Sequence, residues 1–135
     1  MRSLLDINVI IALYIAAPCI TCPITQNGVL RIMCQPAYPN HRPVAQVAER
    51  LEEACNHASH VFWPGQISLL SKGFIRWDRM LGPRQITDSY LLALAFIHGG
   101  RFVSFDQRIH VDLVPDASHT HLTVIELPNG QQGPG

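Results

Sequence analysis

The sequence predicts an α/β fold in which helices cover both faces of a parallel sheet. Short apolar runs with strand-like composition lie at residues 4–5, 20–22, 60–63, 101–105 and 122–127, and amphipathic stretches separate most of them. Strands that alternate with helices are expected to pair in parallel. Two of the apolar runs end directly on an aspartate, Asp6 and Asp106. Open α/β sheets place their functional sites at the carboxyl ends of their strands, so these aspartates mark the expected site.

Length, composition and net charge limit the classes of protein that this sequence can encode. A chain of 135 residues predicts one domain, residues 1–127, followed by a flexible tail at 128–135. With 47% hydrophobic and 15% charged residues, the composition fits a compact fold rather than a disordered chain. Ten basic and ten acidic residues give no net charge, so a nucleic acid would have to be held by a local basic patch or by metal ions. Neutrality also favours association with other chains.

The N-terminal region and the cysteines bear on location in the cell. Asp6 and Asn8 interrupt the apolar region that would otherwise resemble a signal peptide, and no run is long enough to span a membrane, so we expect a cytoplasmic protein. Cys19 and Cys22 have the spacing of half a zinc site or a redox pair. Because no second pair completes four ligands, buried reduced thiols are the favoured interpretation for the four cysteines.

The first half of the chain shows a strand, a short turn or helix at 8–13, and a second strand. Pro23 is well placed as the first residue of a helix that extends to about Cys34. Within that helix, Gln26 lies on the same stripe as Val29 and Met33, so its side chain is expected to point inward. A proline-containing loop at 35–42 follows.

The second half begins with an amphipathic helix opened by Pro43. Its predicted apolar face consists of Val44, Val47, Ala48, Leu51 and Cys55, and Glu49, Arg50, Glu52 and Glu53 form the other face. Broken helical turns are expected at 67–81. Thr87 is a good N-cap for the next helix, Asp88 suits its first turn, and Gly99 suits its end. The strands at 101–105 and 122–127 complete the expected order.

Three aspartates, Asp6, Asp88 and Asp106, are expected to converge if the two strands and the helix are neighbours. Three carboxylates in one pocket raise each other's pKa unless a divalent cation neutralises them. An oxygen-only ligand set favours Mg²⁺ or Mn²⁺ over zinc. Such a site suits the attack of a metal-activated water on a phosphodiester.

Four blocks of the sequence resemble, in order, those of the PIN-domain toxins of the VapC type. The blocks are Leu-Leu-Asp6-Ile-Asn8-Val, Cys22-Pro-Ile-Thr-Gln-Asn-Gly-Val-Leu-Arg31, Gln85-Ile-Thr87-Asp88-Ser-Tyr-Leu-Leu-Ala-Leu-Ala95 and Ser104-Phe-Asp106. The likeness runs from about Leu4 to Asp106 and continues more weakly to Leu127.

This resemblance implies a PIN-like three-layer α/β/α sandwich with a central parallel sheet. It implies a magnesium-dependent endoribonuclease toxin of a toxin–antitoxin pair that acts on structured RNA such as transfer or ribosomal RNA. A cognate antitoxin and a homodimer are the expected partners. By position, Asp6, Asp88 and Asp106 match the metal-binding aspartates, Asn8 matches a residue that supports Asp6, and Thr87 would cap the helix and orient Asp88.

The chain departs from the family pattern in two places. Gln26 stands where most PIN nucleases carry a glutamate, and an amide oxygen binds a metal or its water with one negative charge fewer. In the catalytic hypothesis Gln26 positions metal-bound water. Only twenty positions separate Asp6 from Gln26, where the family fits an additional helix.

Structural alternatives stand beside these assignments. Asp88 suits a helix N-terminus, Asp106 suits a turn, and Gln26 fits a satisfied buried amide. His119 and His121 would share a face in a strand but lack a third ligand for a metal. The basic and aromatic group of Lys72, Arg76, Trp77, Arg79 and Arg84 fits either RNA contact or a solvated face.

Two alternative functions stay open. In one, a catalytically weakened PIN fold binds its antitoxin or RNA without cleaving. In the other, the aspartates serve phosphoryl transfer in a phosphatase or receiver-like domain.

Overall fold

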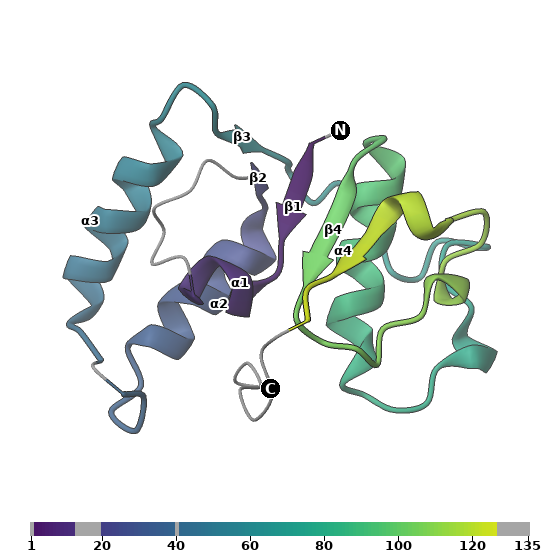
Figure 1. The fold of residues 1–135 in the computed structure, drawn as a ribbon, viewed down its shortest axis with the longest axis horizontal. Helices are drawn as coiled ribbons and strands as arrows, with labels where there is room; N and C mark the ends of the chain where they lie inside the picture. The colour runs from purple at the N-terminus through teal and green to yellow at the C-terminus, as the bar shows by residue number, and fades with distance from the viewer. Residues whose placement is uncertain (1, 13–19, 40, 127–135) are drawn as a thin grey trace.

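The central element is a five-stranded sheet in the order β3-β2-β1-β4-β5, in which every neighbouring pair is parallel (Figure 1). The computed structural model describes residues 2–12, 20–39 and 41–126. The strands are β1 (Ser3–Leu5), β2 (Ile20–Thr21), β3 (Val61–Phe62), β4 (Arg101–Ser104) and β5 (Leu122–Val124). The predicted parallel sheet is confirmed. β5 ends at Val124, earlier than the predicted 127, and Leu127 and the predicted tail lie outside the described residues.

Helices pack on both faces of this sheet, which makes the three predicted layers. They are α1 (Ile7–Ala12), α2 (Pro23–Met33), α3 (Val44–Cys55) and α4 (Gln85–Ile97). Side chains alternate between the faces of a strand, so Leu4 and Phe102 belong to the core that includes α4, and Leu5 and Val103 belong to the core that includes α1, α2 and α3. Figure 1 shows α4 beside β4, and the other three helices around the opposite end of the sheet.

α1 follows β1 directly and packs against α2. Pro23 begins α2 as predicted, because a proline at the first helical position has the required φ and needs no hydrogen bond there. Gly28 of α2 lies against Ile7: a Cβ at Gly28 would come within 2.7 Å of Ile7 Cγ1. The absence of a side chain at Gly28 therefore lets α2 hold the first residue of α1, next to Asp6.

α4 starts three residues earlier than the sequence predicts, because its N-cap is Arg84, so the assignment of Thr87 as N-cap is wrong. The carbonyls of Gly82 and Pro83 accept hydrogen bonds from the backbone N–H groups of Gln85 and Ile86, at 3.1 Å and 3.2 Å. Pro83 fixes a helical φ, so helical turns begin in this Gly-Pro segment. Thr87 is exposed inside the first turn.

The predicted end of α4 is confirmed. Gly99 has a φ of 65°, and the N–H groups of Gly99 and Gly100 donate to the carbonyls of Phe96 and Ala95 at 3.0 Å and 2.8 Å. This is a Schellman motif, which needs a left-handed residue directly after the helix. It turns the chain from α4 into β4, which lies next to β1.

Two features outside the main helices and strands differ from the patterns weighed above. His119–His121 forms a short 3₁₀ helix, so the condition under which these histidines would share a strand face is not met. His121 instead accepts a hydrogen bond from the Ser118 N–H at Nδ1 and contacts the ring of Phe96 edge-on. Val44 is 60% exposed at the start of α3, where the helix extends beyond the sheet, whereas Val47 and Leu51 are buried as predicted. The broken turns predicted at 67–81 include one 3₁₀ helix, Trp77–Arg79.

The three cysteines that the structure describes agree with the prediction of reduced thiols. Cys22 is fully buried in the core, Cys34 and Cys55 are half-buried, and all three are free thiols. Cys19 lies outside the described residues. Among the described residues, no helix combines the length and apolarity needed to cross a membrane.

Candidate metal centre

Asp6 lies at the carboxyl end of β1 and is buried. Its backbone N–H donates to the Val103 carbonyl at 2.8 Å, which extends the pairing of β1 with β4. By alternation its side chain points to the same face as Leu4, toward α4. The carboxylate accepts the Ile7 N–H at 2.8 Å and the Ser104 hydroxyl at 2.7 Å. Burial raises the pKa of Asp6, and the nearby charge of Asp106 raises it further, against these two hydrogen bonds.

Asp88 comes to the same place from the first turn of α4. Burial raises its pKa to about 7, and the charges of Asp6 and Asp106 act in the same direction, while Arg108 lowers it. A carboxylate next to a helix N-terminus would ordinarily be stabilised in its charged form. The pKa of Asp88 is raised instead, first because the carboxyl group is partly buried and then because two negative charges lie near it.

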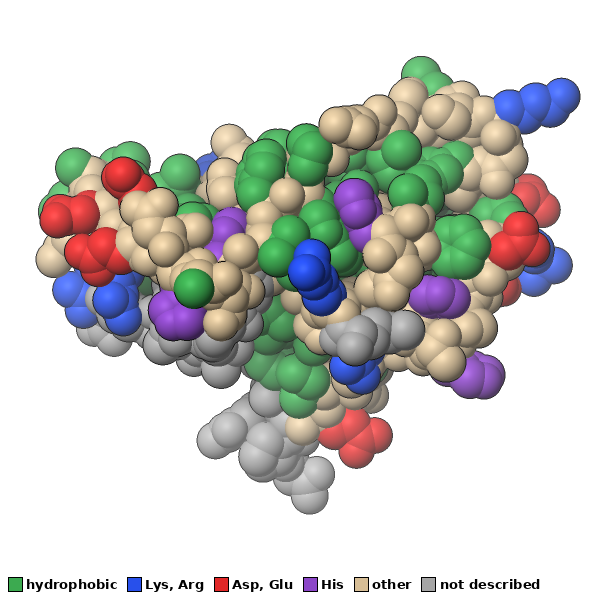
Figure 2. Space-filling view, turned by 90° about the horizontal axis from the view of Figure 1, so that it is seen from above, with side chains coloured by type: hydrophobic (Ala, Val, Ile, Leu, Met, Phe, Trp, Pro, Cys, Tyr) green, Lys and Arg blue, Asp and Glu red, His purple; other side chains and the backbone are tan. Residues whose placement is uncertain are grey.

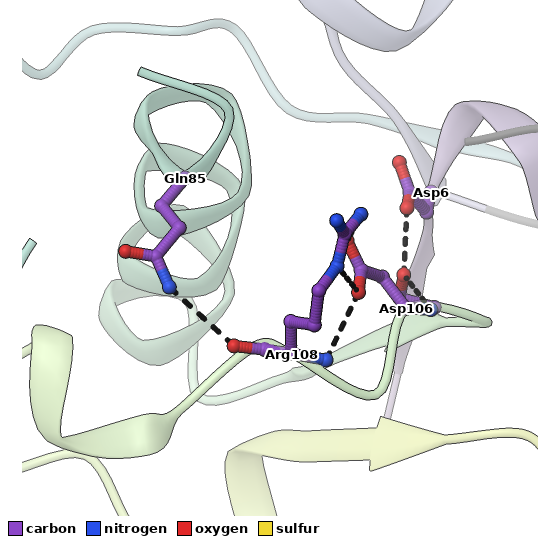
Figure 3. Close-up of polar contacts among 5 residues, drawn as sticks. Asp6, Gln85, Asp106 and Arg108 are labelled. Carbon is purple, nitrogen blue, oxygen red and sulfur yellow. Dashed lines mark hydrogen bonds and ion pairs between the residues drawn. The ribbon is translucent and has the colours of Figure 1, made fainter. Parts of the chain in front are cut away.

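Asp106 follows β4 and is held by Arg108 (Figure 3). Nε and Nη2 of Arg108 donate to Oδ1 and Oδ2 of Asp106 at 2.9 Å and 3.1 Å, and the Arg108 N–H donates to Oδ1 at 2.9 Å. The hydrogen bond from the Arg108 side chain is the main cause of the lowered pKa of Asp106. The Asp106 N–H also donates to Oγ of Ser104 at 3.1 Å, so one hydroxyl links Asp6 and Asp106.

Asp6 and Asp106 follow neighbouring strands and share the Ser104 hydroxyl, and Asp88 is close enough to both for their charges to raise its pKa. Within the described ranges, no three His, Cys, Asp or Glu side chains are grouped as a ready-made metal site. Asp106 is not free to act as a metal ligand in this arrangement, because both of its oxygens accept hydrogen bonds from Arg108. The charges nevertheless fit a divalent cation, because Asp6 and Asp88 carry raised pKa values in a region of carboxylates and all three side chains offer oxygen ligands.

Gln26 lies on α2, with its amide engaged by residues of β2 and α3. Its Nε2 donates to Oγ1 of Thr21 at 3.0 Å and lies 3.7 Å from Sγ of Cys55. Nε2 of His60 contacts the same Thr21 hydroxyl at 2.8 Å, and burial lowers the pKa of His60. Gln26 is half-buried, as its place on the inner stripe predicts, and these contacts match the alternative of a satisfied amide.

The remaining predicted site residues differ in their surroundings. Asn8 is half-buried in the first turn of α1, two residues after Asp6. Arg76, Arg79 and Arg84 are exposed. Arg79 forms an ion pair with Asp112 at 3.1 Å, whereas Arg84 is near enough to Asp106 to lower its pKa. Of the three arginines, Arg84 is thus linked to the acidic centre.

The surface carries mixed charges, as the zero net charge predicts. Figure 2 shows acidic and basic side chains side by side at the end of the molecule formed by α3, where Arg50 pairs with Glu53 at 3.4 Å. The view shows no broad basic face for a polyanion.

Sequence reasoning missed two side chains of this centre, Ser104 and Arg108. Ser104 is a polar residue on the strand face that carries Phe102, and a buried hydroxyl on an apolar face signals a buried partner. Arg108 had a weaker signal, because an arginine two residues after an aspartate is common in turns. Gln85 also belongs here, since its Nε2 donates to the Arg108 carbonyl at 3.4 Å (Figure 3).

The five-stranded parallel sheet with helices on both faces, and with Asp6 and Asp106 just after β1 and β4, is consistent with the class of PIN-like α/β proteins. Comparison with known proteins agrees. The chain is 39% identical over 142 residues to ribonuclease VapC44 of Mycobacterium tuberculosis, with 93% of this chain and 100% of that relative covered. It is 32% identical to ribonuclease VapC39 of the same organism, with 78% and 89% covered, and 30% identical to ribonuclease VapC29, with 78% and 86% covered.

The chain belongs to the VapC family of ribonucleases. No family model matches it, and no solved structure does. The alignment with VapC44 spans 142 positions, more than the 135 residues of this chain, so the relative contains residues that this chain lacks. Between Asp6 and Gln26 the structure describes α1 and β2, and residues 13–19, where the short spacing bears on an additional helix, lie outside the described residues.

Proposed function

We propose that this protein is the endoribonuclease toxin of a toxin–antitoxin pair, and that it cleaves RNA with a divalent metal ion held by Asp6, Asp88 and Asp106. The observation that supports the metal dependence is that Asp6 and Asp106, which follow the neighbouring parallel strands β1 and β4, are linked through the Ser104 hydroxyl, with Asp88 near both in the first turn of α4. Such negative charge is tolerable in a partly buried site when a cation neutralises it. Mg²⁺ is the proposed ion, and Mn²⁺ is its expected substitute.

When bound, the metal supplies a lowered pKa for an attacking water and neutralises charge on the phosphodiester. The protein's own residues position the ligands. Ser104 donates to Asp6 and accepts from the Asp106 backbone, so it sets the relative position of the two strand-end carboxylates. The Ile7 N–H directs the other oxygen of Asp6. In this proposal Gln26 positions metal-bound water, and its hydrogen bond to Thr21 restrains its amide.

The proposed substrate is structured RNA, such as transfer or ribosomal RNA. Arg84 supports contact with RNA phosphates at this edge, because it is exposed and close to Asp106. Arg76 is exposed on the same connection between β3 and α4, and Arg79 contributes less while it pairs with Asp112. A cognate antitoxin, a homodimer and a cytoplasmic location complete the proposal, by analogy with the family.

The test is incubation of the purified chain with total RNA in Mg²⁺, in Mn²⁺ and in EDTA. We expect discrete fragments with either metal and none in EDTA, because the carboxylates alone provide no activated water. Excess Mn²⁺ added after EDTA should restore cleavage. Cleavage that continues in EDTA would contradict the proposed metal dependence, and no cleavage of any RNA under all conditions would contradict the proposed activity.

A weakened, non-cleaving PIN fold is the second candidate function. The observation that favours it is Gln26, which replaces a negatively charged ligand with an amide already bonded to Thr21. In the same experiment, this candidate predicts that the chain retains RNA, or its antitoxin, in a gel-shift measurement and leaves the RNA intact in Mg²⁺ and Mn²⁺.

A further inference from the structure

Arg108 has a place at the acidic centre that the proposed function does not explain. Its guanidinium makes a bidentate pair with Asp106, and its backbone N–H binds the same carboxylate. A carboxylate that accepts three hydrogen bonds from one residue has little capacity left for a cation. Asp106 is thus bound by a residue of its own loop in the protein without metal.

The loop that carries Arg108 is tied to the helix that carries Asp88. Nε2 of Gln85, the first residue of α4, donates to the Arg108 carbonyl at 3.4 Å, and Oε1 of Gln85 accepts the Leu81 N–H at 2.7 Å (Figure 3). The backbone of Arg108 is therefore held near the centre. Its side chain is 61% exposed, so no tight packing holds it beyond the contacts with Asp106.

We propose that Arg108 is an internal counterion of Asp106 that a divalent metal ion must displace in order to bind all three aspartates. This inference rests on the proposed metal-dependent function. An exposed ion pair breaks at small cost, so the exchange is reversible at millimolar metal. The displaced guanidinium stays on the tethered loop, where it is placed to contact an RNA phosphate.

In this proposal Arg108 is a positioning residue for metal binding, because its guanidinium occupies a carboxylate that the metal would use. A nearby positive charge that makes no bond to Asp106 should affect metal binding less. Arg84 provides the matched control, since it acts on Asp106 through its charge whereas Arg108 also bonds to it. Arg108→Gln and Arg84→Gln remove the same charge. Only Arg108→Gln removes the bidentate contact.

The experiment measures Mn²⁺ binding to the purified chain by isothermal titration calorimetry at low ionic strength, without RNA. We expect Arg108→Gln to lower the apparent Kd about three- to tenfold, and Arg84→Gln to change it less than about twofold. Arg108→Lys, which keeps the charge and loses the fork, should fall between wild type and Arg108→Gln. In the wild-type protein, the NMR signal of the Arg108 Nε–H should shift as Mg²⁺ is added.

Unchanged or weaker Mn²⁺ binding by Arg108→Gln would overturn the counterion role, and so would equal effects of Arg108→Gln and Arg84→Gln. Either result would leave the proposed function standing if wild-type cleavage still requires a metal. Failure of the wild-type chain to bind Mn²⁺ at any concentration tested would overturn both.

Discussion

Asp6→Asn should reduce RNA cleavage on the order of a thousandfold or more and leave the fold intact. Charge stabilisation by a bound metal is worth several kcal/mol, and each ~1.4 kcal/mol changes the rate about tenfold. Asn keeps the shape of Asp and can still accept the Ile7 N–H, and the Ser104 hydroxyl can accept from its amide. The substitution also removes a buried charge with a raised pKa, so it should not destabilise the protein.

The measurement is the initial rate of RNA cleavage in saturating Mg²⁺, with circular dichroism as the check on folding. Asp78→Asn is the matched control, because Asp78 is an exposed carboxylate on the short 3₁₀ helix Trp77–Arg79. Asp78→Asn should cleave at the wild-type rate. A folded Asp6→Asn variant that cleaves within about tenfold of wild type would remove Asp6 from the catalytic centre.

Asp88→Asn should make the metal-free protein more stable above pH 7, although it abolishes cleavage. The folded state holds a proton on Asp88 up to a pKa of about 7, whereas the unfolded chain releases it near 3.8. Between these values the folded state binds more protons, so the free energy of unfolding falls as pH rises, and the loss is complete above pH 7. Allowing for screening by solvent, this loss is roughly 1–2 kcal/mol.

Thermal unfolding in EDTA at several pH values from 5 to 8 tests this sign. The wild-type Tm should fall across this range, and Asp88→Asn should keep a higher Tm at pH 8, by roughly 4–8 °C. Some slope will remain in the variant, since the pKa of Asp6 is raised as well. Saturating Mg²⁺ should raise the wild-type Tm at pH 8 and change the variant less. A lower Tm for Asp88→Asn at pH 8 would show that the carboxylate stabilises the fold.

The sequence predicts the sheet and the positions of Asp6 and Asp106 just after their strands well, because strong local signals specify them. Leu4 and Leu5 followed by Asp6 have the pattern of a buried strand that ends on a charge, and β4 repeats it with Ser104 and Asp106. Gly99 marks a helix end whose left-handed φ glycine adopts easily. The direction of each strand follows from the alternation of elements.

Other features depend on contacts that no local pattern contains. Thr87 has good capping chemistry, but the Gly82–Pro83 turn starts α4 earlier, so the threonine has no end to cap. The pairing of Arg108 with Asp106 and of Arg79 with Asp112 depends on how loops lie in space. Gln26 illustrates the same limit, since its partners Thr21 and Cys55 come from β2 and α3.

The proposed activity depends most on one cation lying among the carboxylates of three separate segments. The most direct measurement is anomalous diffraction from crystals grown with Mn²⁺ above neutral pH, where Asp88 is charged. We predict a manganese peak bounded by Asp6, Asp88 and Asp106, with the Arg108 guanidinium withdrawn from Asp106. Crystals of protein that cleaves RNA in Mn²⁺, but in which manganese lies elsewhere or contacts none of these aspartates, would contradict it.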